Sequence, residues 1–257
     1  MTPGGAAKYQ QRWLVYLDVL GYREMVRTAV TRRRIAELIE DFRHSIGETM
    51  DVMARQQHSH AARDVRAKVL GDAICVTTAP SDRGGLRALT SAAIVAVSLA
   101  TRGMFVRGGI ARGGHYDDGS VLLSPALVAA HEEETKAVYP RVVVPDSLLK
   151  ALESQRRLTP DLDDYIRMDT DGVRFVHYLH LLHFLDRKLS PERPGMGLRL
   201  TLTFHKWSIE NRWHTAPRTE RVIPKYQWLA KYHNSFCREV LPPDALDECE
   251  VELDGIA

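Results

Sequence analysis

Two aspartates occupy positions at which a carboxylate could take part in catalysis or metal binding. Asp18 ends the apolar run of residues 13–17, and Gly21 follows it closely. A continuous apolar run with a carboxylate at its end is typical of a buried strand whose polar tip reaches the sheet edge. Asp72 follows Gly71 inside a second apolar stretch, residues 65–78, which is the pattern of a hairpin with a polar tip.

The strand and the hairpin would bring the two carboxylates to the same edge of a sheet. Like charges buried side by side are costly unless cations neutralise them. Divalent ions with oxygen ligands do this and also bind triphosphates, and two such ions about 3.5–4 Å apart can activate a hydroxyl and stabilise a leaving oxygen. Gly21 would let the backbone approach a phosphate, and the helix that follows would offer free N–H groups.

The elements that must position these residues follow from the spacing of apolar residues. In chain order, the sequence predicts a strand at 13–18, a helix at 23–55, a hairpin at 65–78, a helix at 86–101, strand 104–110, helix 125–136 and strand 142–144. The order β-α-β-β-α-β, then α-β, predicts an α+β fold of the ferredoxin-like split βαβ type. Its antiparallel or mixed sheet would have helices packed on one face.

The pattern changes after about residue 155, so we expect a core over residues 1–155 and a second part over 156–257. In the second part, residues 169–172 indicate a turn between short β runs, and helices are expected at 198–212 and 225–240.

Two features of the second part bear on function. His177, His180 and His183 lie three apart in what reads as a β run, which would place them on alternating faces and argues against a metal site. The tail from residue 242 is acidic, and we expect it to be mobile.

Composition narrows the class of protein. The chain has 257 residues, 44% of them apolar, and a net charge of +2, which does not indicate a nucleic-acid-binding protein. Its three scattered cysteines form neither a disulfide framework nor a zinc pattern. We find no signal-peptide core and no apolar stretch long enough to span a bilayer. A cytoplasmic protein without membrane or nucleic-acid partners is therefore expected.

Three short motifs resemble those of the class III nucleotidyl cyclases. Residues 16–22 read YLDVLGY and resemble the family's F-x-D-[IV]-x-G-[FY]. Residues 68–72 read KVLGD, like its K-x-x-G-D hairpin, and residues 107–113 read RGGIARG, like its R-x-G-I-x-x-G strand. The order and spacing also agree. The resemblance implies a cyclase catalytic core over residues 1–155 and a lyase that converts a nucleoside triphosphate to a 3′,5′-cyclic nucleotide. Residues 156–257 would complete the fold and add a C-terminal helical extension.

The resemblance also implies roles for individual residues. Asp18, Asp72 and the carbonyl of Val19 would bind two Mg²⁺ or Mn²⁺ ions. The residues expected to contact the substrate are Tyr16, Val19, Leu20, Gly21, Tyr22, Lys68 and Arg112, and the catalytic residues are Asp18, Asp72, Arg107, Lys136 and Arg141. Class III sites form between two subunits, so a head-to-tail homodimer with composite sites is expected.

The chain departs from the usual class III pattern in two places. Residues 124–132 lack the Asn and Arg of the family's G-x-x-V-N-x-A-x-R segment. Arg107, Arg112, Lys136 and Arg141 are the candidates to supply the missing positive charge. The family's adenine-reading Asp falls near Val121, while its Lys is kept as Lys68. Loss of one partner at the base edge would disfavour adenine.

The whole chain most resembles the pyrimidine cyclases of the Pycsar anti-phage systems. The supporting segments are residues 106–110, 124–127, 139–142 and 225–234. This resemblance implies synthesis of cyclic UMP or cyclic CMP, with UTP favoured over CTP, and a separate effector that the product activates. Two alternatives stay open, a purine cyclase and a catalytically inactive cyclase-like module that binds nucleotide. A diguanylate cyclase is disfavoured because the chain has no G-G-[DE]-E-F segment.

Overall fold

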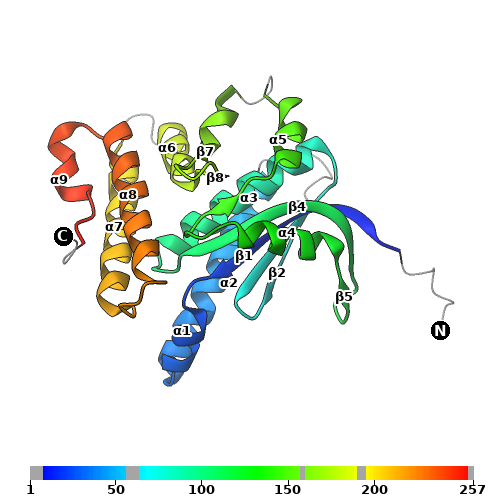
Figure 1. Cartoon of the computed structure of the whole chain (residues 1–257), viewed down its shortest axis with the longest axis horizontal. Coiled ribbons are helices and arrows are strands. Elements are labelled where there is room, and N and C mark those ends of the chain that lie inside the picture. The colour runs from blue at the N-terminus through cyan, green and yellow to red at the C-terminus, as the bar shows by residue number, and fades with distance from the viewer. Residues whose placement is uncertain (1–7, 56–63, 157–159, 190–194, 254–257) are drawn as a thin grey trace.

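The computed structural model describes residues 8–55, 64–156, 160–189 and 195–253, and one mixed sheet organises them. Its strands follow the order β2-β3-β1-β4-β6-β8-β7, and β5 pairs with β4 (Figure 1). The strands are β1 (Gln10–Val19), β2 (Arg66–Leu70), β3 (Ala73–Thr78), β4 (Val106–Asp117), β5 (Leu122–Leu123), β6 (Val142–Val143), β7 (Ile166–Met168) and β8 (Arg174–Val176). Strands β4 and β6 pair in parallel and the other pairs are antiparallel.

The helices complete the α+β fold that the sequence predicts. They are α1 (Tyr22–Thr28), α2 (Arg32–Arg55), α3 (Asp82–Ala100), α4 (Pro125–Thr135), α5 (Asp146–Glu153), α6 (Tyr178–Leu189), α7 (Met196–Thr215), α8 (Ile223–Val240) and α9 (Leu246–Cys249), with 3₁₀ turns at Pro160–Tyr165 and Pro243–Ala245. The order β1-α1-α2-β2-β3-α3-β4 confirms the predicted β-α-β-β-α-β sequence of elements. Within the described residues, no helix has the length and apolar character needed to cross a bilayer.

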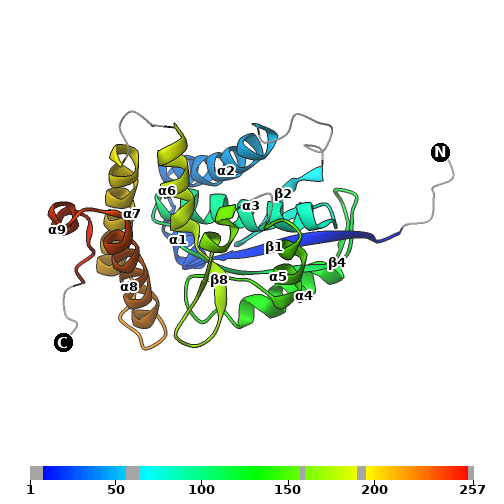
Figure 2. The same cartoon turned by 90° about the horizontal axis from the view of Figure 1, so that it is seen from above.

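The two faces of the sheet are covered differently. Trp13, Val15 and Leu17 of β1 belong to the large core on the side of α3. Leu14 lies on the other face, in a small cluster with Ala126 and Ala130 of α4. Figure 2 shows α2 and α3 on one side of β1 and β4, with α4 on the opposite side. Helix α4 is thus an exception to the expectation that the helices share one face.

Two local predictions differ from the structure. The helix expected over residues 23–55 is broken, because Ala29 leaves the helical conformation and the Thr31 hydroxyl accepts a hydrogen bond from the Arg34 N–H at 3.2 Å, which starts α2. The β run expected through the three histidines is wrong, since residues 178–189 form α6. Tyr178 and Leu181 both pack into the core, and their three-residue spacing is that of a helix.

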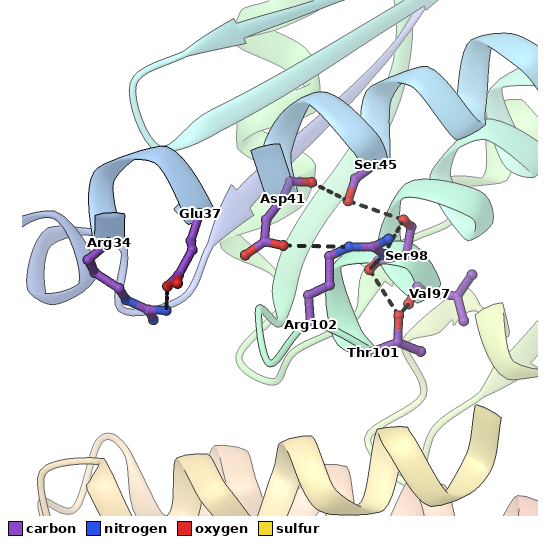
Figure 3. Close-up of polar contacts among 8 residues, drawn as sticks. All are labelled: Arg34, Glu37, Asp41, Ser45, Val97, Ser98, Thr101 and Arg102. Carbon is purple, nitrogen blue, oxygen red and sulfur yellow. Dashed lines mark hydrogen bonds and ion pairs between the residues drawn. The ribbon is translucent and has the colours of Figure 1, made fainter. Parts of the chain in front are cut away.

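A polar contact fixes α2 against α3. The Ser98 hydroxyl donates to the Ser45 hydroxyl at 3.1 Å, and Arg102 donates to the Ser98 carbonyl at 2.6 Å (Figure 3). Arg102 also lies 3.7 Å from the Asp41 carboxylate. Because the two buried serines satisfy each other and Arg102 adds contacts at their edge, α2 keeps a fixed position against α3.

The second part of the chain packs onto the first. The large core contains residues from both sides of residue 155, for example Trp13 and Trp228. The division into two parts at that residue stays a prediction. The tail was expected to be mobile, but its described portion is held against α8. Asn234 of α8 exchanges hydrogen bonds of 3.0 and 2.8 Å with the backbone of Val251. Val251 is buried.

The close packing of α4 on β4 gives the first prediction. A Cβ atom at Gly109 would lie 2.4 Å from the Ala130 carbonyl oxygen and 2.7 Å from the Glu134 nitrogen. We expect Gly109→Ala to lower the free energy of unfolding by about 1–3 kcal/mol, because the backbone of α4 must move. Gly47→Ala in α2 is the control, since its Cβ would meet nothing within 4 Å and alanine favours a helix by up to about 1 kcal/mol. Urea unfolding measures both, and equal stability of Gly109→Ala and wild type would contradict this packing.

Candidate active site

The tip of the first strand and the tip of the hairpin lie side by side, as the sequence predicts. The Val19 N–H donates to the Asp72 carbonyl at 3.0 Å, and Asp18 lies opposite Ala73 in the β1–β3 pairing. Leu70 pairs with Ala73, so the hairpin loop has two residues. Gly71 has a φ of +65°, which a tight loop of this kind needs at its first position.

Arg107 ties the Asp18 carboxylate to α4. It lies opposite Asp18 in the β1–β4 pairing, and its Nε is 3.4 Å from Asp18 Oδ2. The same Nε is 2.5 Å from Glu134 Oε1, an ion pair that lacks the alignment of a hydrogen bond. Glu134 is only 2% exposed. One guanidinium therefore serves two carboxylates from two elements, and its position is fixed by both.

Burial and charge together perturb the titration of this cluster. Burial raises the pKa of Asp18, Arg107 opposes this rise, and the nearby Asp72 adds to it. The pKa of Glu134 is also raised, by burial first, with Arg107 again opposing. Burial and the three neighbouring carboxylates raise the pKa of Tyr16 to about 12, so its hydroxyl keeps its proton at neutral pH.

Lys225 brings a second cation to the cluster from the far end of the chain. It lies in the first turn of α8, where burial lowers its pKa and repulsion from Arg107 lowers it further. Asp18 and Glu134 oppose this shift. Sequence reasoning missed both Lys225 and Glu134 as site residues. The local sequence held no signal for either, because α8 and α4 meet the end of β1 only in the folded chain.

The residues present suit divalent cations. The Asp18 and Asp72 carboxylates and the Val19 carbonyl are the hard oxygen donors that Mg²⁺ and Mn²⁺ prefer. Asp72 is exposed, and Asp18 shares Arg107 with Glu134, so Arg107 keeps a counter-ion if Asp18 turns toward a cation. Across the described ranges, no group of three or more His, Cys, Asp or Glu side chains is arranged to hold a metal ion. Two side chains and a carbonyl leave several coordination positions for phosphate oxygens and water.

Lys68 has a carboxylate partner from the neighbouring part of the sheet face. Its ammonium lies 2.8 Å from both carboxylate oxygens of Asp117 at the end of β4. Asp117 also accepts a hydrogen bond from the Gly119 N–H at 2.9 Å. Val121, the residue that the sequence resemblance places near the adenine-reading position, is 47% exposed. The Lys68 ammonium, a donor, and the Asp117 carboxylate, an acceptor, are therefore paired beside β2.

The glycine turn after Asp18 is present, but its side chains face inward. Gly21 has a φ of +73° at the start of α1. The Leu20 N–H donates to the Phe105 carbonyl at 2.9 Å, and the Tyr22 ring contacts Phe42 edge-on at 6.1 Å. Leu20 and Tyr22 are partly buried against the core, and their contacts with a substrate stay predictions.

Three predicted cations have partners away from Asp18. Arg112 lies over the Trp13 ring at 5.9 Å, on the α3 side of the sheet. The Lys136 ammonium binds both carboxylate oxygens of Glu133 at 2.8 Å on the surface. Arg141 is buried, with its guanidinium bound to two carboxylates of the β7–β8 turn, Asp169 and Asp171. The structure brings Arg107 to Asp18 and gives these three other contacts, and their catalytic roles stay predictions.

Comparison with known proteins gives structural likenesses but no match to a family model or a curated protein. Among solved structures, the catalytic core of a rhodopsin-guanylyl cyclase with converted specificity, in complex with ATPαS, is similar to this chain. The TM-score is 0.46 at 14% identity, over 66% of this chain and 96% of that one.

The raised pKa of Asp18 predicts that its charge costs stability. A carboxyl whose pKa is higher in the folded chain than in the unfolded chain adds stability at low pH, and this is lost as the pH rises through the folded-state pKa. We expect Asp18→Asn to be more stable than wild type at neutral pH, with the difference shrinking as the pH falls below the pKa of Asp18. Urea unfolding of both proteins over a pH series measures this.

Asp118→Asn is a control of opposite sign. Hydrogen bonds from the backbone N–H groups of Val121 and Ser120 lower the pKa of the Asp118 carboxyl. Its contribution to stability is therefore present at neutral pH and is lost as the pH falls through its folded-state pKa. Asp118→Asn should gain nothing at neutral pH. A loss of stability in Asp18→Asn at neutral pH would mean that Arg107, and not burial, dominates the Asp18 carboxyl.

Proposed function

We propose that the chain is a nucleotidyl cyclase of the class III type, which converts a pyrimidine nucleoside triphosphate to a 3′,5′-cyclic nucleotide and pyrophosphate. UTP is the favoured substrate, with cyclic UMP as product, and CTP is the second choice. The observation that carries this proposal is the pair of carboxylates on adjacent strand tips, joined through the 3.0 Å hydrogen bond from Val19 to Asp72 and neighboured by Arg107.

The charge of the site explains why cations are needed. Three carboxylates, Asp18, Asp72 and Glu134, surround the two cationic side chains of Arg107 and Lys225. Such a site repels a polyphosphate until further positive charge enters it. Two Mn²⁺ or Mg²⁺ ions, when bound, would neutralise the phosphates and lower the pKa of the ribose 3′-hydroxyl.

The chain's own residues would hold and orient the reacting groups. Asp18, Asp72 and the Val19 carbonyl would hold the cations at the strand tips. The 3′-oxygen forms a bond to the α-phosphorus, the bond from that phosphorus to pyrophosphate breaks, and the hydroxyl proton passes to solvent. Arg107 and Lys225 stand where negative charge grows on the phosphoryl oxygens and on pyrophosphate. Lys225 thus becomes a candidate for the positive charge that the family's missing Arg would supply.

The Lys68–Asp117 pair is the candidate reader of the base. Its ammonium can donate to a base carbonyl or ring nitrogen, and its carboxylate can accept from a base N–H. The hydrogen bond from Lys68 lowers the pKa of Asp117, which keeps it an acceptor at neutral pH. The edge of uracil meets this pair, with O4 as acceptor and N3–H as donor. Adenine offers a similar edge, so the earlier objection to adenine no longer holds, and resemblance to the Pycsar cyclases supports UTP.

Assembly and signalling follow from the same resemblance. We propose a head-to-tail homodimer in which each site takes its cation ligands from one subunit and its base reader from the other. The cyclic nucleotide would act in anti-phage defence by activating a separate effector. A protein with this role needs no nucleic-acid or membrane partner and would act in the cytoplasm.

Removing either tip carboxylate tests the reaction. We expect Asp18→Asn and Asp72→Asn each to lower kcat by at least about 100-fold, because each removes a cation ligand. The measurement is incubation with each of the four ribonucleoside triphosphates and Mn²⁺, with mass identification of any cyclic product. Asp146→Asn, which changes an exposed carboxylate paired with Arg174, should keep wild-type activity. Full turnover in either tip variant, or no cyclic product from wild type with any triphosphate, would refute the proposal.

Base selection is tested separately at Lys68 and Asp117. We expect Lys68→Gln and Asp117→Asn to change the ratios of kcat/KM among the four triphosphates by about tenfold or more, because each leaves one group at the base edge unpaired. Lys150→Gln, an exposed lysine of α5, is the control. An equal fall for all four substrates would show that the pair supports the fold and does not read the base.

A further inference from the structure

A cavity lies on the α4 side of the sheet, at the opposite end of β1 from the strand tips. Its volume is about 140 Å³, and residues of β1, β2, β3 and β4 line it. Gln10 and His115, which pair with each other, are among these residues, whereas Asp18 pairs with Arg107 at the opposite end of the same two strands. At about 3.4 Å per residue of an antiparallel strand, the eight steps from Gln10 to Asp18 correspond to roughly 27 Å. The cavity is therefore separate from the strand tips of the same chain that would hold the cations, although Asp117 of the proposed base reader forms part of its wall.

A buried arginine in this cavity lacks a close anionic partner. Arg12 is 8% exposed, and its Nη1 donates to the Asp64 carbonyl at 3.2 Å. Among the described residues, only the Asp64 carboxylate lies within ion-pair distance of Arg12, with its Oδ1 3.9 Å from Arg12 Nη1. A guanidinium with so little exposure needs more compensation than one ion pair at this distance provides. A bound anion would supply it.

The charges around the cavity are predominantly positive. Arg66 of β2 is exposed, and the described residues offer it no ion-pair partner. The one carboxylate in the lining, Asp117, is already bound by Lys68. The ionised side chains that line the cavity or bind a lining residue are four cations, Lys8, Arg12, Arg66 and Lys68, and three carboxylates, Asp64, Asp117 and Asp118. Two of the carboxylates, Asp117 and Asp118, already accept hydrogen bonds from the lining, so the remaining positive charge in a concave surface favours an anion.

Neutral donors complete the lining. The His115 Nδ1 lies 3.0 Å from the hydroxyl of Ser124, the residue that caps α4, and the buried Thr77 adds a hydroxyl of its own. Burial lowers the pKa of His115, Asp117 opposes this, and Arg12, Arg66 and Lys68 lower it further. The imidazole is therefore neutral at pH 7. The positive charge around it comes from the arginines and lysines and favours a negatively charged ligand.

We propose that this cavity binds a phosphoryl group without the help of a metal ion. Arginine guanidinium groups form paired hydrogen bonds with phosphate oxygens, and two arginines face the same space. The volume admits inorganic phosphate or pyrophosphate, or the phosphate end of a nucleotide, but cavities that hold a whole drug-sized ligand begin at roughly 300 Å³. The chemistry that the site recognises is the dianionic phosphoryl group.

Isothermal titration calorimetry in EDTA tests this site apart from the cyclase proposal. Inorganic phosphate, pyrophosphate and UMP are titrated separately into wild type and into the Asp18→Asn, Asp72→Asn double variant. We expect binding to both proteins, with the tightest ligand telling whether the natural source is a free phosphate or a nucleotide. Arg66→Gln should weaken binding about tenfold, the loss of one charge-assisted hydrogen bond. Arg43→Gln, an exposed arginine of α2 paired with Glu40, should bind like wild type.

Each result of the titrations either supports or overturns phosphoryl binding in this cavity. No heat of binding to wild type in EDTA, or equal weakening in Arg66→Gln and Arg43→Gln, overturns the proposal. Because Arg12 is buried and its replacement can unfold the chain, Lys8→Gln serves as the second variant and should also weaken binding. Loss of binding in the Asp18→Asn, Asp72→Asn protein would place the anion at the strand tips and would also overturn it. Cyclase activity does not enter any of these readouts, so the two proposals can fail independently.

Discussion

The position of the Asp18 carboxylate is the constraint on which the rest of the site depends. Strand β1 pairs with β3 on one side and β4 on the other, so Asp18 lies between Ala73 and Arg107. The two-residue turn before Ala73 then leaves Asp72 no position other than beside it. Two negative groups so close need positive charge, and Arg107 provides part of it from the neighbouring strand. Glu134 in turn fixes Arg107 from α4.

The small residues of the α4 face make that arrangement possible. Gly109 and Ala111 of β4 meet Ala130 of α4, and the absence of larger side chains lets the helix backbone approach the strand closely. Glu134, one turn further along α4, thereby reaches Arg107. A thicker layer here would separate the helix from the sheet and leave Arg107 with Asp18 alone. The Arg107–Glu134 ion pair of the site therefore depends on the close packing of α4 on β4.

The α4 face carries opposite charges at its two ends. Carboxylates gather where β1 ends, around Asp18, and cations gather where it begins, around Arg12 and Arg66. The Lys68–Asp117 ion pair lies at the wall of the basic cavity. The acidic end suits cations that carry a polyphosphate, whereas the basic end suits a bare anion. The same sheet face can thus offer two kinds of phosphate recognition that differ in their need for metal.

The sequence alone determined the two carboxylate tips and the order of the elements. Apolar runs that end in Asp18 and surround Gly71 specify a strand end and a tight turn through local patterning, which needs no tertiary information. The short apolar run after His177 predicts a strand, but the structure has a helix there. A short apolar run does not distinguish the two-residue period of a strand from the 3.6-residue period of a helix. Only the tertiary structure joined Lys68 to Asp117, 49 residues away, and brought Lys225 of α8 to Asp18. Contacts across a sheet face or between distant helices depend on how the layers pack. The spacing of residues along one segment does not predict that packing.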